Sequence, residues 1–141
     1  MQSINPFTGK LLSNYDNYSA AKTNQIINQV DAEFQNWKKT SFQERKELML
    51  DLKKQLLDQK ETLASLMVAE MGKVKREALG EIEKCAWVCD YYAENAESFL
   101  NNEVIKTEAT ESYVSFQPIG TVLAIMPWNF PFWQVFRFLA P

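Results

Sequence analysis

Asn129 is the first residue near the C-terminus whose type and setting could support chemistry, since it stands between two prolines in the sequence PWNFP. A side-chain amide donates hydrogen bonds without titrating, which suits the stabilisation of an oxyanion that develops during acyl chemistry. Asparagine is also a good N-cap residue, so Asn129 could instead cap a helix that follows. The spacing alone favours the cap.

Arg137 is the second such residue, because it is the only charge in an aromatic, apolar C-terminal stretch. In a helix, Phe130, Gln134 and Arg137 would share one face, since they are four and three residues apart. A guanidinium beside an aromatic wall can hold both oxygens of a carboxylate ligand. Arg137 could equally be a surface residue whose stem lies along apolar neighbours, and the spacing does not decide between the two.

Cys85 and Cys89 are the two cysteines of the chain, and their spacing places both thiols on one face of a helix. They alternate with Ile82 and Tyr92 in an apolar stripe. The chain has no histidine, so it offers neither a Cys-His nucleophile pair nor the further ligands of a zinc site. The favoured interpretation is that both cysteines pack as small apolar side chains, and no metal site is expected.

The composition argues against several other classes of function. The net charge is −3 and no basic patch occurs, so a nucleic-acid partner is not expected. The four glycines form neither a GxGxxG nor a GxxxxGKS/T phosphate-binding loop. Residues 119–141 are long enough for a membrane span, but two prolines, Asn129 and Arg137 argue against one. No signal peptide is evident, so a cytoplasmic location is expected.

Helices dominate the elements that must position these residues. Ser19 is the predicted N-cap of a first amphipathic helix, and SFQE, from Ser41 to Glu44, fits a capping box that begins a second. The second helix is expected to end near Gln59, and another to continue through Met71. The apolar positions that define the first helix are Ile27, Val30, Phe34 and Trp37.

A longer helix is predicted from Lys73 to about Leu100. It follows Gly72, which suits a left-handed C-cap of the preceding helix. Steps of three and four join its apolar residues into one continuous buried stripe. The stripe consists of Val74, Ala78, Ile82, Cys85, Cys89, Tyr92, Ala96 and Phe99.

The pattern changes after this helix. β-Branched and aromatic residues between Val104 and Gln117 predict two short strands that form a ribbon. The apolar run Thr121–Met126 has the length of a strand covered on both faces, as in a parallel α/β sheet. Pro131 suits the first position of the helix that follows. In such sheets ligands bind at the carboxyl ends of strands, which is where Asn129 would lie.

The sequence PIGTVLAIMPWNFPFWQVFRFLAP, at 118–141, resembles the aldehyde dehydrogenase superfamily, whose pattern there is P-x-G-x-x-x-x-I-x-P-W-N-F-P. NPFTG at 5–9 resembles the opening of that family. EMGKVKREALGEI at 70–82 resembles its E-x-G-K…EA…E-(I/V) helix, which is followed by YYAENAESF at 91–99. The resemblance covers essentially the whole chain, but only the first part of the family's much longer sequence.

The resemblance implies an α/β fold that is incomplete in this chain. Residues 1–100 would form the N-terminal helical part of the cofactor-binding domain. Residues 101–118 would form the β-arm of the oligomerisation domain. Residues 119–141 would supply the first strand and helix of the Rossmann-like cofactor-binding core. Full-length members would be homo-oligomers, either dimers or tetramers.

The resemblance also implies roles for single residues. Asn129 would be the oxyanion-hole amide, and Phe130 would line the substrate tunnel. Arg137, eight residues after Asn129, matches the carboxylate-binding arginine of succinate-semialdehyde dehydrogenases, the subgroup that PWNFPFWQVFR resembles most. Contacts to NAD or NADP are implied for Ile125, Met126, Pro127 and Trp128.

The family's chemistry needs residues that this chain does not supply. A cysteine thiolate attacks the aldehyde, hydride passes to the nicotinamide, and a glutamate assists hydrolysis of the thioester. Cys85 and Cys89 match no nucleophile position. We therefore expect the N-terminal part of an NAD(P)-dependent enzyme for a small-molecule aldehyde, inactive by itself. The alternatives are an interaction module that binds a full-length homologue and a truncated reading frame without function.

Overall fold

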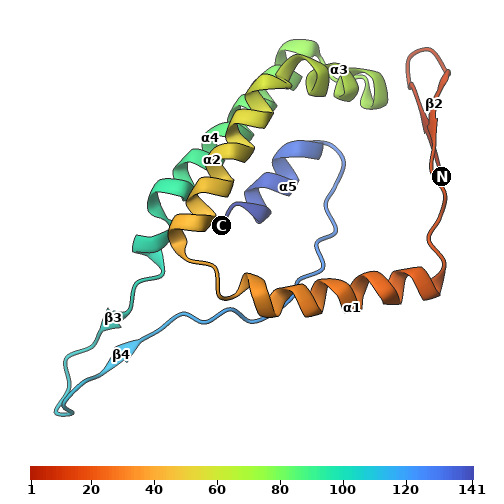
Figure 1. The fold of residues 1–141 in the computed structure, drawn as a ribbon. Helices are drawn as coiled ribbons and strands as arrows, with labels where there is room; N and C mark the ends of the chain where they lie inside the picture. The colour runs from red at the N-terminus through yellow and green to blue at the C-terminus, as the bar shows by residue number, and fades with distance from the viewer.

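The structure, a computed structural model, describes all 141 residues, and most of its regular elements are helices (Figure 1). The helices α2 and α3 pack along α4, and α5 packs against α4 as well. Two small antiparallel sheets pair β1 with β2 and β3 with β4. The elements are β1 (Gln2–Ile4), β2 (Leu11–Asn14), α1 (Ala20–Trp37), α2 (Phe42–Asp58), α3 (Lys60–Met71), α4 (Lys75–Phe99), β3 (Glu103–Val104), β4 (Tyr113–Val114) and α5 (Pro131–Leu139).

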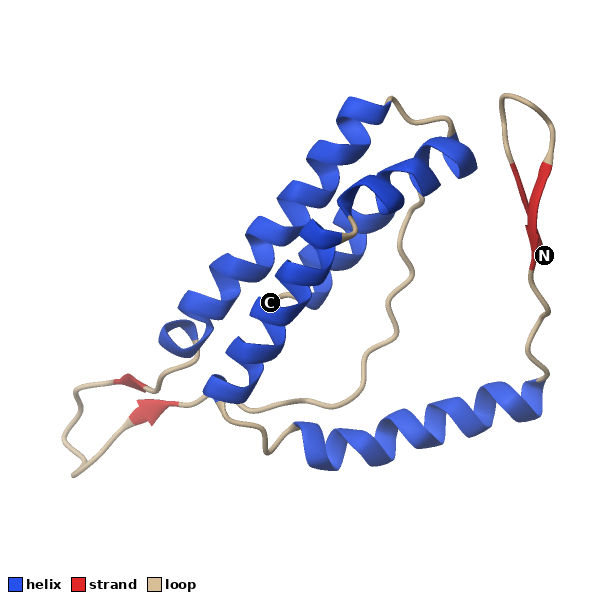
Figure 2. Cartoon of the chain, turned by 45° about the horizontal axis from the view of Figure 1, so that its top comes forward, coloured by secondary structure: helices blue, strands red, loops and turns tan.

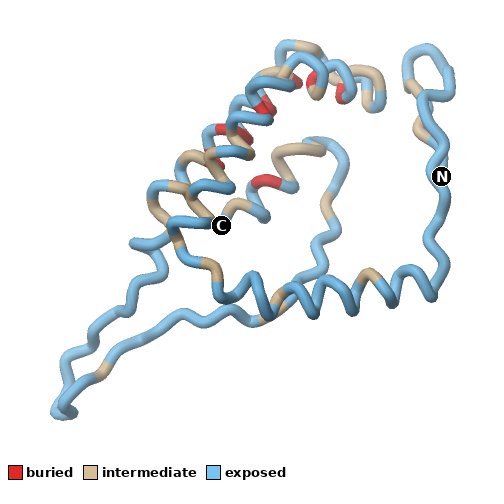
Figure 3. The backbone as a smooth tube through the Cα atoms, viewed as in Figure 1, coloured by how far each residue is buried: buried red, intermediate tan, exposed pale blue.

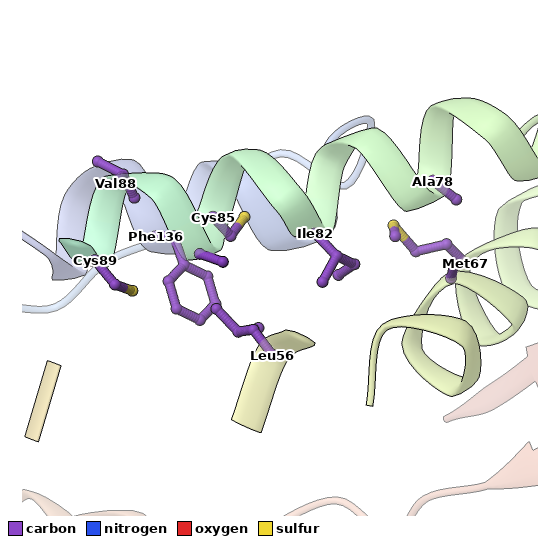
Figure 4. Packing of buried hydrophobic residues seen from close by; sticks show 10 residues of the cluster. Leu56, Met67, Ala78, Ile82, Cys85, Val88, Cys89 and Phe136 are labelled. Atoms are coloured by element: carbon purple, nitrogen blue, oxygen red, sulfur yellow. The ribbon is translucent and has the colours of Figure 1, made fainter. Parts of the chain in front are cut away.

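The hydrophobic core is small and follows one side of α4 (Figures 3 and 4). The stripe predicted for this helix is confirmed from Ala78 to Cys89, whereas its end positions, Val74 and Phe99, are exposed. Residues of α2, α3 and α5 complete the cluster, so the long helix is the element on which the others assemble. The core consists of Leu56, Ala64, Met67, Ala78, Ile82, Cys85, Ala86, Val88, Cys89 and Phe136.

The helix boundaries follow the local signals in the sequence. The Ser19 hydroxyl accepts a hydrogen bond from the Lys22 N–H at 3.2 Å, as predicted for an N-cap. Ser41 and Glu44 form the predicted capping box in both directions. Gly72 ends α3 with φ of 70°, a left-handed conformation that glycine adopts without a steric penalty.

The apolar stripe of α1 predicts the helix correctly but is not covered by the rest of the chain. No residue of α1 is buried. Ile27, Val30 and Trp37 are 57%, 46% and 47% exposed, and Figure 3 shows almost the whole helix as exposed. None of the helices combines the length and the apolar composition that a membrane span requires.

The strand predicted at Thr121–Met126 is absent, and the segment runs as an irregular connection from β4 to α5 (Figure 2). A strand forms only where a neighbouring strand pairs with its backbone N–H and C=O groups. Neither of the two sheets includes this segment, so the chain has no parallel sheet. The apolar side chains of the segment are therefore open to solvent, and Leu123 and Ile125 are each 85% exposed.

The strands of the chain form two hairpins, β1–β2 and β3–β4. The ribbon predicted between Val104 and Gln117 is confirmed as β3 and β4, although each strand has only two residues. It projects as an arm from the end of α4 (Figure 1). The β1–β2 hairpin approaches α3, where the Ser3 hydroxyl donates a hydrogen bond to Glu70 Oε1 at 2.7 Å.

Candidate functional site

The candidate site residues lie on the loop that enters α5 and on the helix itself. Trp128 is 74% exposed and Asn129 is exposed beside it. Pro131 occupies the first turn of α5, as predicted, but the N-cap position belongs to Phe130 and no side chain of the loop caps the helix. The interpretation of Asn129 as the N-cap is therefore wrong, because the helix begins one residue later than that role requires.

The N-terminus of α5 is capped instead by Glu81, which belongs to α4. Its Oε1 atom accepts hydrogen bonds from the backbone N–H groups of Phe132 and Trp133, each at 2.9 Å. The first N–H groups of a helix have no partner within the helix and carry partial positive charge, so a carboxylate stabilises them. A side chain some fifty residues away in the sequence thus fixes where α5 begins.

Lys73 completes this arrangement from the segment between α3 and α4. Its ammonium group pairs with Glu81 Oε2, and the two side chains are only 7% and 2% exposed. The same ammonium lies 4.1 Å from the centroid of the Phe130 ring, within the range of a cation–π interaction. One lysine therefore contacts both the cap of α5 and the residue next to Asn129.

The apolar side of α5 holds the helix on α4. Phe136 is buried in the core, and Phe132, Trp133 and Ala140 are partly buried against the same core cluster. Lys84 of α4 lies 3.9 Å from the centroid of the Trp133 ring. The helix is thus fixed along its length as well as at its N-terminus.

A pocket of about 360 Å³ opens between α3 and the start of α5. Trp128 lines it from the loop, so this hollow adjoins the candidate residues. The other lining residues are Leu66, Met67, Glu70, Met71, Pro131 and Phe132.

Arg137 lies on α5 one turn beyond Gln134, as the predicted helix requires. Its side chain is exposed, and the ion pairs of the chain join other residues. The guanidinium is free to meet a ligand, but a plain surface residue would have the same exposure. Its contact with a carboxylate stays a prediction, as do the contacts of Ile125, Met126, Pro127 and Trp128 with a nucleotide.

The two cysteines pack in the core, which confirms their interpretation from the sequence. Both are buried free thiols on α4. Burial, with a smaller contribution from the charge of Glu81, raises the pKa of Cys85 to about 12. Burial, with a smaller contribution from Asp90, raises the pKa of Cys89 to about 11. Both groups are thus neutral thiols at physiological pH, whereas a cysteine nucleophile reacts as the thiolate.

Sequence reasoning did not identify Lys73 and Glu81, the buried ion pair that caps α5, as residues of the site. One signal was available, because Glu81 directly precedes Ile82 of the apolar stripe, and an acidic residue beside a buried stripe needs a partner. Both residues also fall within EMGKVKREALGEI, the segment that resembles the family. Their common partner, the N-terminus of α5, could not be found from spacing within that segment.

Comparison with known proteins places the whole chain in one family. The profile described as the aldehyde dehydrogenase family matches residues 1–141. A probable NADP(+)-dependent succinate-semialdehyde dehydrogenase from Synechocystis sp. is 40% identical over 139 residues, which cover 99% of this chain and 31% of the relative. The succinate semialdehyde dehydrogenase Sad of Escherichia coli, described as NAD(P)+-dependent, is 38% identical over 139 residues, or 99% of this chain and 30% of the relative.

Solved structures agree with the sequence relatives. The crystal structure of succinic semialdehyde dehydrogenase from Streptococcus pyogenes in complex with NADP+ matches with a TM-score of 0.93 and 32% identity, over 99% of this chain and 31% of that one. A crystal structure of an E. coli NADP-dependent enzyme matches with a TM-score of 0.91 and 28% identity, over 99% and 29%. The fold is that of the N-terminal part of aldehyde dehydrogenases, and the chain spans about a third of the length of these relatives.

Proposed function

Because the chain belongs to the aldehyde dehydrogenase family, we propose that it is the N-terminal part of an NADP- or NAD-dependent enzyme that oxidises succinate semialdehyde to the carboxylic acid. The position of Asn129 carries this proposal. Its amide is exposed at the entrance to a helix whose N-terminus a buried ion pair holds in place. A hydrogen-bond donor on a rigid support is what stabilisation of an oxyanion requires.

The residues of the loop fit one side of a nicotinamide cofactor. Ile125, Pro127 and Trp128 present exposed apolar side chains, and the backbone of 121–126 belongs to no strand ladder, so its polar groups remain available. When bound, NADP or NAD accepts a hydride from the substrate. The chain has no glycine-rich phosphate loop, so the proposed contacts are to the flat rings rather than to the phosphates.

The chain's own residues would act on the substrate at two points. The Asn129 side-chain N–H would donate a hydrogen bond to the aldehyde oxygen as that atom gains negative charge, an effect of roughly 3 kcal/mol on the barrier. The Arg137 guanidinium would hold the distal carboxylate of succinate semialdehyde. Phe130 would form an apolar wall between these two points.

The two cysteines of this chain, by contrast, do not suit the role of the attacking thiolate. Both are buried, neutral thiols that belong to the core cluster (Figure 4). We therefore propose that the thiohemiacetal and thioester form on a cysteine of the further polypeptide that the longer relatives contain, and that these 141 residues do not turn over alone.

We further propose that the β3–β4 arm contacts a second subunit. Val104, Tyr113 and Val114 are 82%, 51% and 46% exposed on this projecting ribbon. Exposed apolar side chains of this kind often mark a protein interface. We propose with it the division of the chain into a helical part (1–100), an arm (101–118) and the start of the nucleotide-binding core (119–141).

A second candidate function rests on other exposed apolar surfaces of the chain. The uncovered stripe of α1 and the segment 119–125 would let the chain act as an interaction module that binds a full-length homologue. Co-expression with such a homologue, followed by size-exclusion chromatography, tests this function. Co-elution of the two chains is the expected result for the module, and separate elution would exclude it.

The catalytic proposal is tested with a fusion in which this chain replaces the matched 139 residues of the Synechocystis enzyme. We expect the fusion to form NADPH from NADP and succinate semialdehyde, and the 141-residue chain to form none. The Asn129→Ala fusion should lose about 100- to 1,000-fold in kcat, the usual loss when one oxyanion donor is removed. An active fusion that keeps its kcat after this substitution would refute the role of Asn129.

A further inference from the structure

We infer that Lys73 and Glu81 are positioning residues that set the orientation of the Asn129 amide, an inference that rests on the proposed function. Neither residue contacts Asn129 itself. They act through Phe130, the residue that directly follows it, and through the first turn of α5.

The contacts of Glu81 are divided between its two oxygens. Oε1 accepts hydrogen bonds from the N–H groups of Phe132 and Trp133, each at 2.9 Å, while Oε2 faces the Lys73 ammonium. With one oxygen on the helix and the other on the lysine, the carboxylate has little freedom to rotate. The position of the first turn of α5 is thereby tied to the position of Lys73.

Lys73 also contacts the residue that is next to Asn129 in the sequence. Its ammonium lies 4.1 Å from the Phe130 ring centroid, and Phe130 is the residue directly after Asn129. The peptide between Asn129 and Phe130 is thus held on its C-terminal side by the ring and by the capped turn. Asn129 is exposed, so these neighbours are the groups available within the chain to fix its direction.

Burial makes the arrangement stiff. The side chains of Lys73 and Glu81 are 7% and 2% exposed, so water solvates neither charge well and each depends on the other as its counter-ion. The other ion pairs of α4 are far more exposed, including Lys60–Glu83, where the glutamate side chain is 56% exposed. A pair needed only to attach α4 to its neighbours would be expected to resemble these exposed ones.

A positioning role and a purely structural role predict different kinetics. Displacement of Asn129 by about 1 Å would lower kcat by about 100-fold. The substrate carboxylate would meet Arg137 near the other end of α5, which the buried Phe136 holds independently of Glu81. The pair should therefore act on kcat and leave KM nearly unchanged.

The test uses Glu81→Gln, Lys73→Met and the double variant in the fusion, with Glu83→Gln as the matched control on the same helix. We expect kcat to fall about 100-fold in Glu81→Gln with KM within about threefold, and Glu83→Gln to match the unsubstituted fusion. The double variant removes both buried charges and keeps an amide oxygen for the two N–H groups, so it should recover at least about tenfold of the loss. Unchanged kcat in both Glu81→Gln and Lys73→Met would overturn the inference.

A second measurement, on the 141-residue chain, separates this inference from the proposed function. NMR relaxation and amide exchange report the order of the Asn129 side chain and the protection of the Phe132 and Trp133 amides. We expect Glu81→Gln, and also Lys73→Met if the first variant does not fold, to loosen Asn129, while Glu83→Gln leaves it ordered. An equally ordered Asn129 in the Lys73 and Glu81 variants would overturn the inference, whereas an inactive unsubstituted fusion would overturn only the proposed function.

Discussion

Replacement of Glu81 with glutamine is predicted to destabilise the chain far more than replacement of Glu83, although both glutamates lie on α4 and pair with a lysine. Glutamine keeps the shape of the side chain and an oxygen that can accept from the α5 amides. What it removes is the negative charge opposite Lys73. The lysine ammonium, with its side chain only 7% exposed, is then left without a counter-ion.

The size of the effect follows from the difference in burial. Removal of one partner from a buried ion pair costs about 3–5 kcal/mol. The Phe130 ring still faces the Lys73 ammonium in the variant, so we expect the lower end of this range. The exposed Lys60–Glu83 pair should contribute far less, because solvent screens its charges.

The assay is urea unfolding followed by tryptophan fluorescence, with circular dichroism as a second probe. Only 11 of 141 residues are buried, so the free energy of unfolding should be modest, and sucrose is added to favour the folded state in every variant. The Glu81→Gln/Lys73→Met double variant should be more stable than Glu81→Gln alone, because no unpaired charge remains buried. Equal losses in Glu81→Gln and Glu83→Gln would refute the claim that burial gives the Lys73–Glu81 pair its importance.

Three further predictions concern α3 and α4. Gly72→Ala should lower the free energy of unfolding by about 1 kcal/mol, measured by urea unfolding, because φ of 70° strains any residue with a Cβ; an unchanged midpoint would contradict this. Burial raises the pKa of Cys85 to about 12, which lowers the fraction of reactive thiolate. Iodoacetamide should therefore label Cys85 at least about 100-fold more slowly in the folded chain than in the unfolded chain. Because the folded state favours the neutral thiol of Cys85, the free energy of unfolding should fall as the pH rises from 9.0, the ordinary pKa of a cysteine, towards 12. Rapid labelling of the folded chain would contradict the first of these two predictions for Cys85, and a free energy of unfolding that rises over this pH interval would contradict the second.

The sequence predicted the local parts of this fold well. Helix starts at Ser19 and Ser41 and the helix end at Gly72 depend on side chains within one turn of the boundary, so short motifs are sufficient to identify them. The packing stripe of α4 was equally readable, because burial repeats with the period of the helix. In each case the residues that determine the structure are neighbours in the sequence.

The sequence did not predict features that depend on distant or missing partners. The run Thr121–Met126 has the composition of a buried strand, but no neighbouring strand is present to pair with it. Asn129 appeared suited to cap α5, yet Glu81 takes that role from another helix. Spacing along the chain could not reveal this substitution, because it depends on how α4 and α5 pack.

The central claim is that these residues supply the N-terminal part of a succinate semialdehyde-oxidising enzyme. The most direct measurement is the initial rate of NADPH formation by the fusion of this chain with the remainder of the Synechocystis relative, supplied with NADP and succinate semialdehyde. The account predicts sustained turnover that depends on the substrate. A folded fusion that forms no NADPH, beside an active unmodified relative, would contradict it.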